Sequence, residues 1–285
     1  MTESELSSAR QATPVGVRRA HVVRDGGAPE VDLVAVEEAL EIQIDSRSLA
    51  VTMRTPGHDR ELAAGFLYSE GVIDGIEDLE HVEEPSPAGS DLVTLNGDDD
   101  GALLGAARIS VRLSRKLDAK RFESAHREFR ATAACGVCGK QSLDDLCQEL
   151  LSIEPLSCEL DFLRSLPARM RAEQELFEMT GGIHAAALFD PAGELLCLRE
   201  DIGRHNAVDK VIGHALLGGE LPLRGRILAV SGRAGFELVQ KALKAAIPVM
   251  VSVGAASSLA VDMASAAGMM LYSFVGPGRG NLHLS

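Results

Sequence analysis

The residues best suited to chemistry in this chain are two cysteines in a CxxC pair, Cys135-Gly-Val-Cys138, followed by Gly139 and Lys140. A reactive thiol must be exposed, and its thiolate must be stabilised by nearby positive charge or backbone N–H groups. The glycines give the backbone freedom to approach a partner, and Lys140 supplies a nearby cation. We therefore interpret the pair as a nucleophilic sulfur site on a mobile loop.

Two other interpretations of the CxxC pair are less favoured. A structural zinc site would need a second pair of Cys or His ligands, but Cys147, Cys158 and Cys197 stand alone and there is no His-x₃₋₅-His pair. A thioredoxin-like redox pair should lie between a strand and a helix. A helix is expected at 142–151, but no long apolar strand runs into the pair. The sequence therefore predicts no metal at these cysteines.

Length and composition indicate an ordinary globular protein. The 285 residues can form one large domain or two domains with their own cores, and 46% hydrophobic and 25% charged residues are typical values. No apolar run is long enough for a membrane helix, and the polar N-terminus does not resemble a signal peptide. Five cysteines, an odd number, do not suggest a disulfide framework. We expect a cytoplasmic protein without membrane association.

The charge of the chain is negative and uneven. A net charge of −14 argues against a protein that wraps nucleic acid. Twelve acidic residues and no Lys or Arg lie between Glu61 and Asp100. This segment is either a solvated acidic face or a docking surface for a basic partner, and the sequence leaves both open.

The first part of the chain predicts a small, mainly β domain with one helix, residues 15–115, after a disordered tail, residues 1–14. Apolar and polar side chains alternate in its strand-like segments. The expected elements are strands within 31–54, at 91–95 and at 107–113, a hairpin connection at 45–48, and a helix from Asp59, as its N-cap, to about Ser69.

The rest of the chain predicts a segment with the CxxC loop and linker helices, residues 116–165, and a larger α/β cofactor-binding domain, residues 166–285. Alternating helices and short apolar strands are typical of parallel α/β packing. The expected elements are helices at 166–179, 204–217, 235–246 and 259–268, a hairpin of 183–189 with 194–198, and strands at 227–230, 249–253 and 270–275. The fold class is therefore α/β, or α+β overall.

Loops rich in Gly, Ser and Arg follow three of these strands, at 231–235, 254–258 and 276–280. Ligands of open α/β sheets bind beyond the carboxyl ends of the strands. Each loop offers backbone N–H groups to an anion, and Arg233 and Arg279 add positive charge. We expect a phosphate-bearing ligand at this face.

The densest polar cluster, 200–206, opens the helix expected at 204–217. Asp201 is expected to cap that helix, whereas Arg204 and His205 have no evident packing role. His184 lies in an apolar run and is expected to be a core histidine. Cys147 and Cys197 are expected to pack in the core.

The motifs together resemble the formate dehydrogenase accessory sulfurtransferase family (FdhD/NarQ), from about residue 15 to the end of the chain. The residues that carry the resemblance are Pro56-Gly-His-Asp59, Cys135-Gly-Val-Cys138-Gly-Lys140, Thr180-Gly-Gly-Ile-His184, Glu200-Asp-Ile-Gly-Arg-His-Asn-Ala-Val-Asp-Lys210 and Ser231-Gly-Arg233. The resemblance implies that Cys135, with Cys138 alongside, receives persulfide sulfur from a cysteine desulfurase. The sulfur is then passed to the molybdenum bis-guanine-dinucleotide cofactor of formate dehydrogenase.

The resemblance also implies a cofactor segment, which corresponds to Phe274, Val275, Gly276, Pro277, Gly278 and Arg279. Gly276 and Pro277 depart from the family's pattern, which has a basic residue and a glycine there. Whether Arg204, His205, Ser231 and Arg233 also line the site stays open. The larger domain of the family resembles the cytidine deaminase fold, and its members are expected to be homodimers.

The leading hypothesis is thus a sulfurtransferase, with two alternatives. One is a non-catalytic chaperone that binds and delivers the molybdenum cofactor, and the other is a zinc-dependent hydrolase on the deaminase-like fold. Zinc deaminases use H-x-E and P-C-x-x-C motifs. Here Ala185 and Ala186 follow His184, and Ala134 precedes Cys135, so deamination is not expected.

Overall fold

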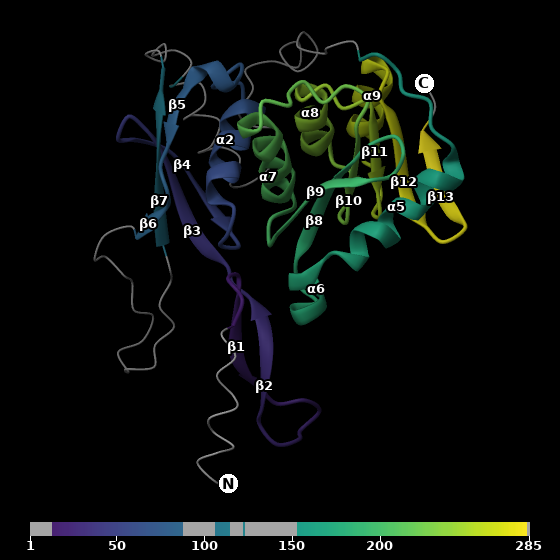
Figure 1. Ribbon diagram of the computed structural model, residues 1–285. Coiled ribbons are helices and arrows are strands. Elements are labelled where there is room, and N and C mark those ends of the chain that lie inside the picture. The colour runs from purple at the N-terminus through teal and green to yellow at the C-terminus, as the bar shows by residue number, and fades with distance from the viewer. Residues whose placement is uncertain (1–12, 88–105, 115–121, 123–152, 284–285) are drawn as a thin grey trace.

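The computed structural model describes residues 13–87, 106–114, 122 and 153–283 of the chain (Figure 1). Cys135, Cys138, Lys140 and Cys147 lie outside the described residues, as do the strand expected at 91–95 and the helix expected at 142–151. No helix in the described ranges is long and apolar enough to cross a membrane.

The larger sheet has six strands: β8 (His184–Phe189), β9 (Leu195–Asp201), β10 (Ile227–Val230), β11 (Val249–Ser252), β12 (Met270–Gly276) and β13 (Arg279–His283). Their order in the sheet is β13-β12-β11-β10-β8-β9. β10, β11 and β12 are parallel, whereas β8, β9 and β13 each run antiparallel to a neighbour. This arrangement confirms the predicted α/β class, and it is compatible with the cytidine deaminase resemblance.

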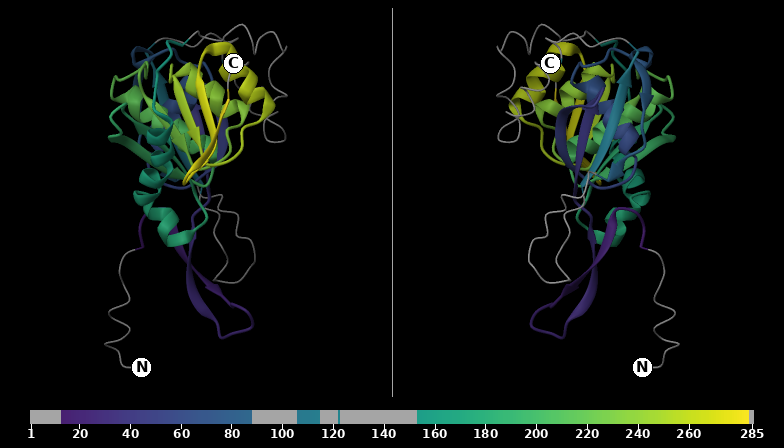
Figure 2. Two further views of the ribbon diagram at one scale, coloured as in Figure 1. Left: turned by 90° about the vertical axis from the view of Figure 1, so that its right-hand side faces the viewer. Right: turned by 90° about the vertical axis from the view of Figure 1, so that its left-hand side faces the viewer.

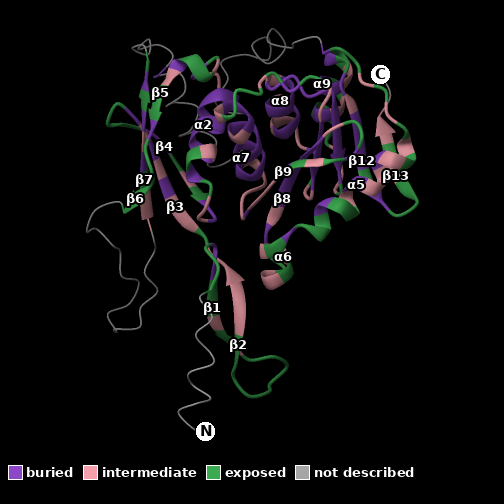
Figure 3. Ribbon diagram, viewed as in Figure 1, coloured by how far each residue is buried: buried purple, intermediate pink, exposed green. Residues whose placement is uncertain are grey.

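Helices cover both faces of the larger sheet: α5 (Leu160–Ala172) packs on one face, and α7 (Arg204–Leu217), α8 (Phe236–Lys244) and α9 (Ser258–Ala267) pack on the other (Figure 1). All residues of β10 and β11 are therefore buried, as continuous apolar strands between two layers require (Figure 3). The strand expected at 194–198 is β9 and continues three residues further, to Asp201. The other predicted helices and strands of this part are confirmed to within one or two residues at each end, apart from two differences.

The first difference is the helix expected at 166–179, which is two helices, α5 and α6 (Glu175–Thr180). α5 begins before the expected start and passes through Pro167, because Leu163, Leu166 and Met170 bury against the sheet. α5 ends at its C-cap, Glu173. A new helix begins where the carboxylate of Glu200 accepts hydrogen bonds from the backbone of the first turn of α6, at 2.8 Å each. The predicted stop at Gly181 is confirmed by its left-handed backbone, with φ +66°.

The second difference concerns the loop expected at 276–280. It turns β12 back into β13, a strand that the sequence did not predict, with Gly276 opposite Arg279 and Gly278 at φ +68°. β12 and β13 therefore form a hairpin, and β13 is the outermost strand of the sheet.

The smaller sheet contains β3 (Glu38–Ile44), β4 (Arg47–Arg54), β5 (Leu79–Val82), β6 (Ser86–Pro87) and β7 (Ala106–Leu113), and the 3₁₀ turn η1 (Ile76–Asp78) precedes β5. The strand order is β4-β3-β7-β5, with β6 paired to β7. Asp45 and Ser46 have φ values of +46° and +66°, so they form the expected hairpin connection with a backbone typical of type I′ turns.

The helix of this part, α2 (Asp59–Ser69), has the expected bounds but a different cap. The N-cap residue is His58, and no side chain caps the helix. Asp59 instead receives a hydrogen bond of 2.9 Å from Nε of Arg54, because the buried guanidinium needs an opposite charge.

α2 joins the two sheets by packing against α7, and one apolar core runs through both helices. The contact depends on two glycines. A Cβ on Gly65 would lie 1.9 Å from the carbonyl oxygen of Asp209, and a Cβ on Gly213 would lie 1.8 Å from that of Glu61. The predicted boundary near residue 115 stays a prediction, although the two parts share this core.

A two-stranded ribbon, β1 (Val17–Val22) and β2 (Glu30–Ala35), projects from the body of the molecule, and α6 lies beside its base (Figure 2).

Candidate functional site

The motifs of the second half meet where β10, β11 and β12 end in the larger sheet, and the carboxyl ends of these strands are called the edge from here on. β10, β11 and β12 are parallel, so the loops that follow them lie at the same edge. β8 is antiparallel to β10, and His184, its first residue, pairs with Asp201, the last residue of β9. The segments 180–184, 200–206, 231–235 and 254–257 therefore surround one place, as the sequence predicted for the loops after β10 and β11.

The loops at this edge approach each other through their backbones. Gly254 donates a hydrogen bond of 2.9 Å to the carbonyl oxygen of Gly232, and a Cβ on Gly254 would lie 2.8 Å from that oxygen. The hydroxyl of Ser231 accepts a hydrogen bond of 2.9 Å from the backbone of Ala185. Ser231 therefore holds the loop on β8.

His184 is half-buried at the start of β8, not enclosed in the core as the sequence suggested. Its ring faces Gly232, where an added Cβ would lie 3.5 Å from Nδ1 of His184. Burial lowers the pKa of His184, and the positive charge of Arg204 lowers it further. The neutral form of the ring is therefore favoured, whereas a nearby negative charge would favour the protonated form.

The same edge carries positive charge. Within the described ranges, neither Arg204 nor Arg233 forms an ion pair. The helices α7 and α8 begin here after Gly203 and Gly235, and no side chain caps either start. Free backbone N–H groups and the helix dipole attract anions, so the edge is suited to phosphate groups.

His205 has a partner that the sequence did not reveal. Its Nε2 lies 2.7 Å from Oε2 of Glu237 in α8, and both side chains are partly buried. The close contact with His205 lowers the pKa of Glu237, against the opposing effect of burial. This contact joins the first turns of α7 and α8.

Phe274 provides an exposed aromatic ring at this edge. It is 47% exposed and has a left-handed backbone with φ +53°, at an irregularity in the pairing of β12 with β13. Its backbone N–H donates a hydrogen bond of 3.0 Å to the carbonyl oxygen of Gly254. A strained backbone that displays an aromatic ring is a feature of binding sites.

The rest of the predicted cofactor segment is divided between core and surface. Val275 is 2% exposed, so its side chain packs inside, and Gly276 is buried as well. Pro277, Gly278 and Arg279 are exposed in the hairpin turn. Of the segment, Phe274 and Arg279 are therefore the side chains best placed to meet a ligand.

Asp201 does not cap α7 as expected. It is fully buried, and its Oδ2 lies 2.7 Å from Nζ of Lys210, which is also buried. The N-cap residue is Gly203. Lys210 was visible in the sequence only as a charged residue among apolar helix positions, so its role required the structure.

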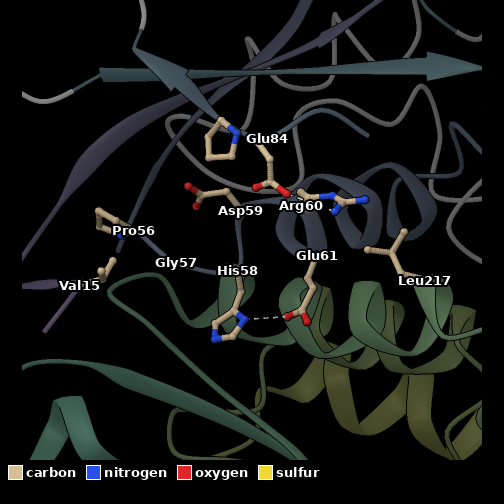
Figure 4. A pocket seen from close by; sticks show the side chains of 10 residues that line it. Val15, Pro56, Gly57, His58, Asp59, Arg60, Glu61, Glu84 and Leu217 are labelled. Atoms are coloured by element: carbon tan, nitrogen blue, oxygen red, sulfur yellow. Dashed lines mark hydrogen bonds and ion pairs between the residues drawn. The ribbon is translucent and has the colours of Figure 1, made fainter. Parts of the chain in front are cut away.

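A second concave region surrounds the Pro56–Asp59 motif (Figure 4). It is a pocket of about 700 Å³ lined by Val15, Pro56, Gly57, His58, Asp59, Arg60, Glu61, Glu84, Pro85 and Leu217. His58 has a φ of +59° and places Nδ1 3.4 Å from Glu61, whose carboxylate also bonds Arg199 and His214. No group of His, Cys, Asp or Glu in the described ranges is arranged to hold a metal ion.

Two of the five cysteines lie in the described part. Cys197 is 5% exposed, which confirms its expected packing role, and burial raises the pKa of its thiol to about 11. Burial also raises the pKa of Cys158. Neither is poised to react as a thiolate.

Comparison with known proteins identifies the family. The model of the FdhD/NarQ family matches residues 35–284. The sulfur carrier protein FdhD of Streptomyces avermitilis is 44% identical over 259 residues, which cover 89% of this chain and 88% of that protein. The same-named protein of Anaeromyxobacter dehalogenans is 44% identical over 292 residues, covering 98% and 96%.

The fold has a solved counterpart. The crystal structure of a candidate formate dehydrogenase accessory protein from Desulfotalea psychrophila matches with a TM-score of 0.66 and 23% identity, over 94% of this chain and 96% of that one. From the family match and the extent of the identity to its relatives, the chain belongs to the FdhD/NarQ family.

Proposed function

We propose that this protein is a sulfur carrier that takes persulfide sulfur from a cysteine desulfurase and transfers it to the molybdenum bis-guanine-dinucleotide cofactor, in the cytoplasm, for use by formate dehydrogenase. Membership of the family and the names of its relatives support this role. The CxxC pair of Cys135 and Cys138 supplies the thiols.

The first transfer is thiol–persulfide exchange at Cys135. Its thiolate attacks the terminal sulfur of the donor's persulfide, so that a new S–S bond forms on Cys135 while the donor's S–S bond breaks. The donor cysteine leaves as a thiolate, and the exchange needs no outside oxidant or reductant. The sulfane sulfur is then available for the cofactor, which is the second substrate.

The observation that carries the proposal is the combination of charge and aromatic surface at the edge of the larger sheet. The uncapped starts of α7 and α8, with Arg204 and Arg233, suit the phosphates of a dinucleotide. The ring of Phe274 is free to stack on a guanine base. We propose a homodimer as the active form, as the family resemblance implies.

Nucleotide binding can be tested by titration calorimetry with guanosine diphosphate. The double variant Arg204→Ala/Arg233→Ala should weaken binding by about tenfold or more, because charged hydrogen bonds to phosphate are lost. Arg224→Ala is the matched control, since Arg224 is exposed ahead of β10, at the opposite end of the strand. Equal affinity in all three proteins would refute the assignment of the edge.

Sulfur transfer can be tested by intact-protein mass spectrometry after incubation with a cysteine desulfurase and cysteine. Wild type should gain about 32 Da, one sulfur, and Cys135→Ala should gain none. An adduct on both proteins would make Cys138 the carrier. No adduct on wild type, with nucleotide binding and dehydrogenase activation retained in the variant, would favour the alternative of a non-catalytic chaperone.

A further inference from the structure

Behind the edge lies a buried ion pair that no part of the proposed function uses. Nζ of Lys210 is 2.7 Å from Oδ2 of Asp201, and their side chains are 1% and 0% exposed. A buried ion pair of this kind is often no more stabilising than an apolar pair of the same size, because both charges lose their water. The pair therefore matters more for the positions of the groups that it joins than for the free energy of unfolding.

The pair ties the start of α7 to the junction between β4 and α2. Lys210 donates hydrogen bonds to the carbonyl oxygens of Thr55, at 2.9 Å, and Glu200, at 3.3 Å. The backbone N–H of Thr55 donates to Oδ2 of Asp201 at 3.2 Å. Thr55 directly precedes the Pro56–Asp59 motif, so two motifs from opposite halves of the chain meet at this pair.

The other carboxylate oxygen of Asp201 holds the first turn of α7. Oδ1 accepts hydrogen bonds from the backbone of Gly203, at 2.8 Å, and from the side chain of Asn206, at 3.0 Å. Asn206 also donates to the carbonyl oxygen of Met53 at 2.7 Å. Gly203 and Asn206 flank Arg204 and His205 in the chain, so Asp201 determines where these two residues stand.

We propose that the Asp201–Lys210 pair is a positioning element that holds Arg204, His205 and the backbone N–H groups at the start of α7 in the geometry that binds the phosphates of the cofactor. The inference rests on the proposed function, since it assumes that the edge binds a nucleotide. Asp201 and Lys210 act through the first turn of α7 and do not themselves contact the ligand.

The same helix contains a matched pair of the same chemistry. Asp209 receives two hydrogen bonds of 2.9 Å from Lys241, which also bonds Glu70 at 2.8 Å. This second pair is also buried, but it ties α7 to α8 and α2 and makes no bond to the first turn of α7. Changing the first pair should therefore disturb the position of the first turn of α7, whereas changing the second pair should affect only the stability of the helix.

The test compares Asp201→Asn/Lys210→Met with Asp209→Asn/Lys241→Met. Both partners of each pair are changed together, because removing one would leave an uncompensated buried charge. In the second variant Glu70 loses Lys241 but is 27% exposed and so keeps access to water. Binding of guanosine diphosphate is measured by calorimetry, each protein being held well below its own melting temperature. We expect about a tenfold rise in Kd for the first variant, because small displacements of binding groups have large effects. The second variant should stay within about twofold of wild type.

Asn206→Ala provides a second measurement that leaves the ion pair in place, should the first variant not fold. It removes one of the bonds between Asp201 and α7, and a smaller rise in Kd, of about threefold, is expected. Wild-type affinity in either the Asp201/Lys210 variant or Asn206→Ala would overturn the inference, as would equal losses in the two double variants. Absence of binding by wild type would overturn the nucleotide assignment as well.

Discussion

The two larger sheets of the molecule differ in how they are covered. In the larger sheet β10 and β11 are buried at every residue, between α5 on one face and α7, α8 and α9 on the other. In the smaller sheet α2 covers one face, and β4 exposes Val51 at 65% and Met53 at 43%. The central strands of the larger sheet are accordingly continuous apolar runs, whereas apolar and polar residues alternate in the strands of the smaller sheet.

This difference explains where the candidate site lies. A sheet held on both faces cannot shift its strand ends, so the loops after β10 and β11 can present Gly232, Arg233 and Gly254 in fixed positions. The smaller sheet supports the same site indirectly, through Thr55 and α2.

The largest expected effect comes from breaking the joint between the two parts. Gly213→Ala should reduce the free energy of unfolding by roughly 3 kcal/mol or more, because its Cβ has no space between the backbones of α7 and α2. Urea denaturation measures this. In the control Gly182→Ala, where an added Cβ meets no atom closer than 3.8 Å, we expect a change within about 0.5 kcal/mol. A loss of unfolding free energy in Gly213→Ala as small as that in the control would show that α2 and α7 can move apart at little cost.

Truncation of one valine in each sheet sharpens the comparison directly. Val251→Ala in β11, where the valine is fully buried, should cost about 2 kcal/mol through lost burial and a small cavity. Val51→Ala in β4, at 65% exposure, should cost less than about 1 kcal/mol, from lower β propensity alone. Equal costs in urea denaturation would mean that Val51 is covered in solution by a partner.

Acid pH tests the charged contact between α2 and β9. Burial tends to raise the pKa of Glu61, but the hydrogen bonds and charge of Arg199 outweigh it and lower this pKa. The carboxylate therefore adds stability above the ordinary Glu pKa of about 4.3, and this stability is lost as pH falls through the lower pKa of the folded state.

Glu61→Gln should accordingly lose about 1.5 kcal/mol at pH 7 and show a flatter decline of melting temperature below about pH 4.5 than wild type. Glu84→Gln, whose partner Arg60 is exposed, should behave as wild type. A decline in Glu61→Gln as steep as that of wild type would rule out the assigned pKa.

The smallest effect is expected at Cys197 in β9. With a pKa of about 11 and 5% exposure, the thiol should remain unmodified by iodoacetamide at pH 7.5 while the protein is folded. Peptide mass spectrometry after brief labelling checks this, with labelling in denaturant as the control. Modification of Cys197 in the folded protein would show that β9, the outermost strand on its side of the larger sheet, opens.

The sequence by itself was sufficient for the features that depend on neighbours along the chain. The bounds of α7 and β10 follow from apolar periodicity and flanking Gly and Pro. The loops after β10 and β11 were placed at one edge because parallel α/β packing was expected, and the motifs around Cys135 and Glu200 pointed to the family.

Only the tertiary structure decided the partners that lie far apart in sequence. Glu200 accepts a hydrogen bond from the first turn of α6, and Asp201 pairs with Lys210 beside Thr55. Gly65 packs closely against the backbone of α7. Periodicity and turn residues are local signals, whereas charge pairing and close backbone contact depend on which surfaces the fold brings together. For that reason the sequence predicted the elements and the edge, and the structure alone revealed what holds them in place.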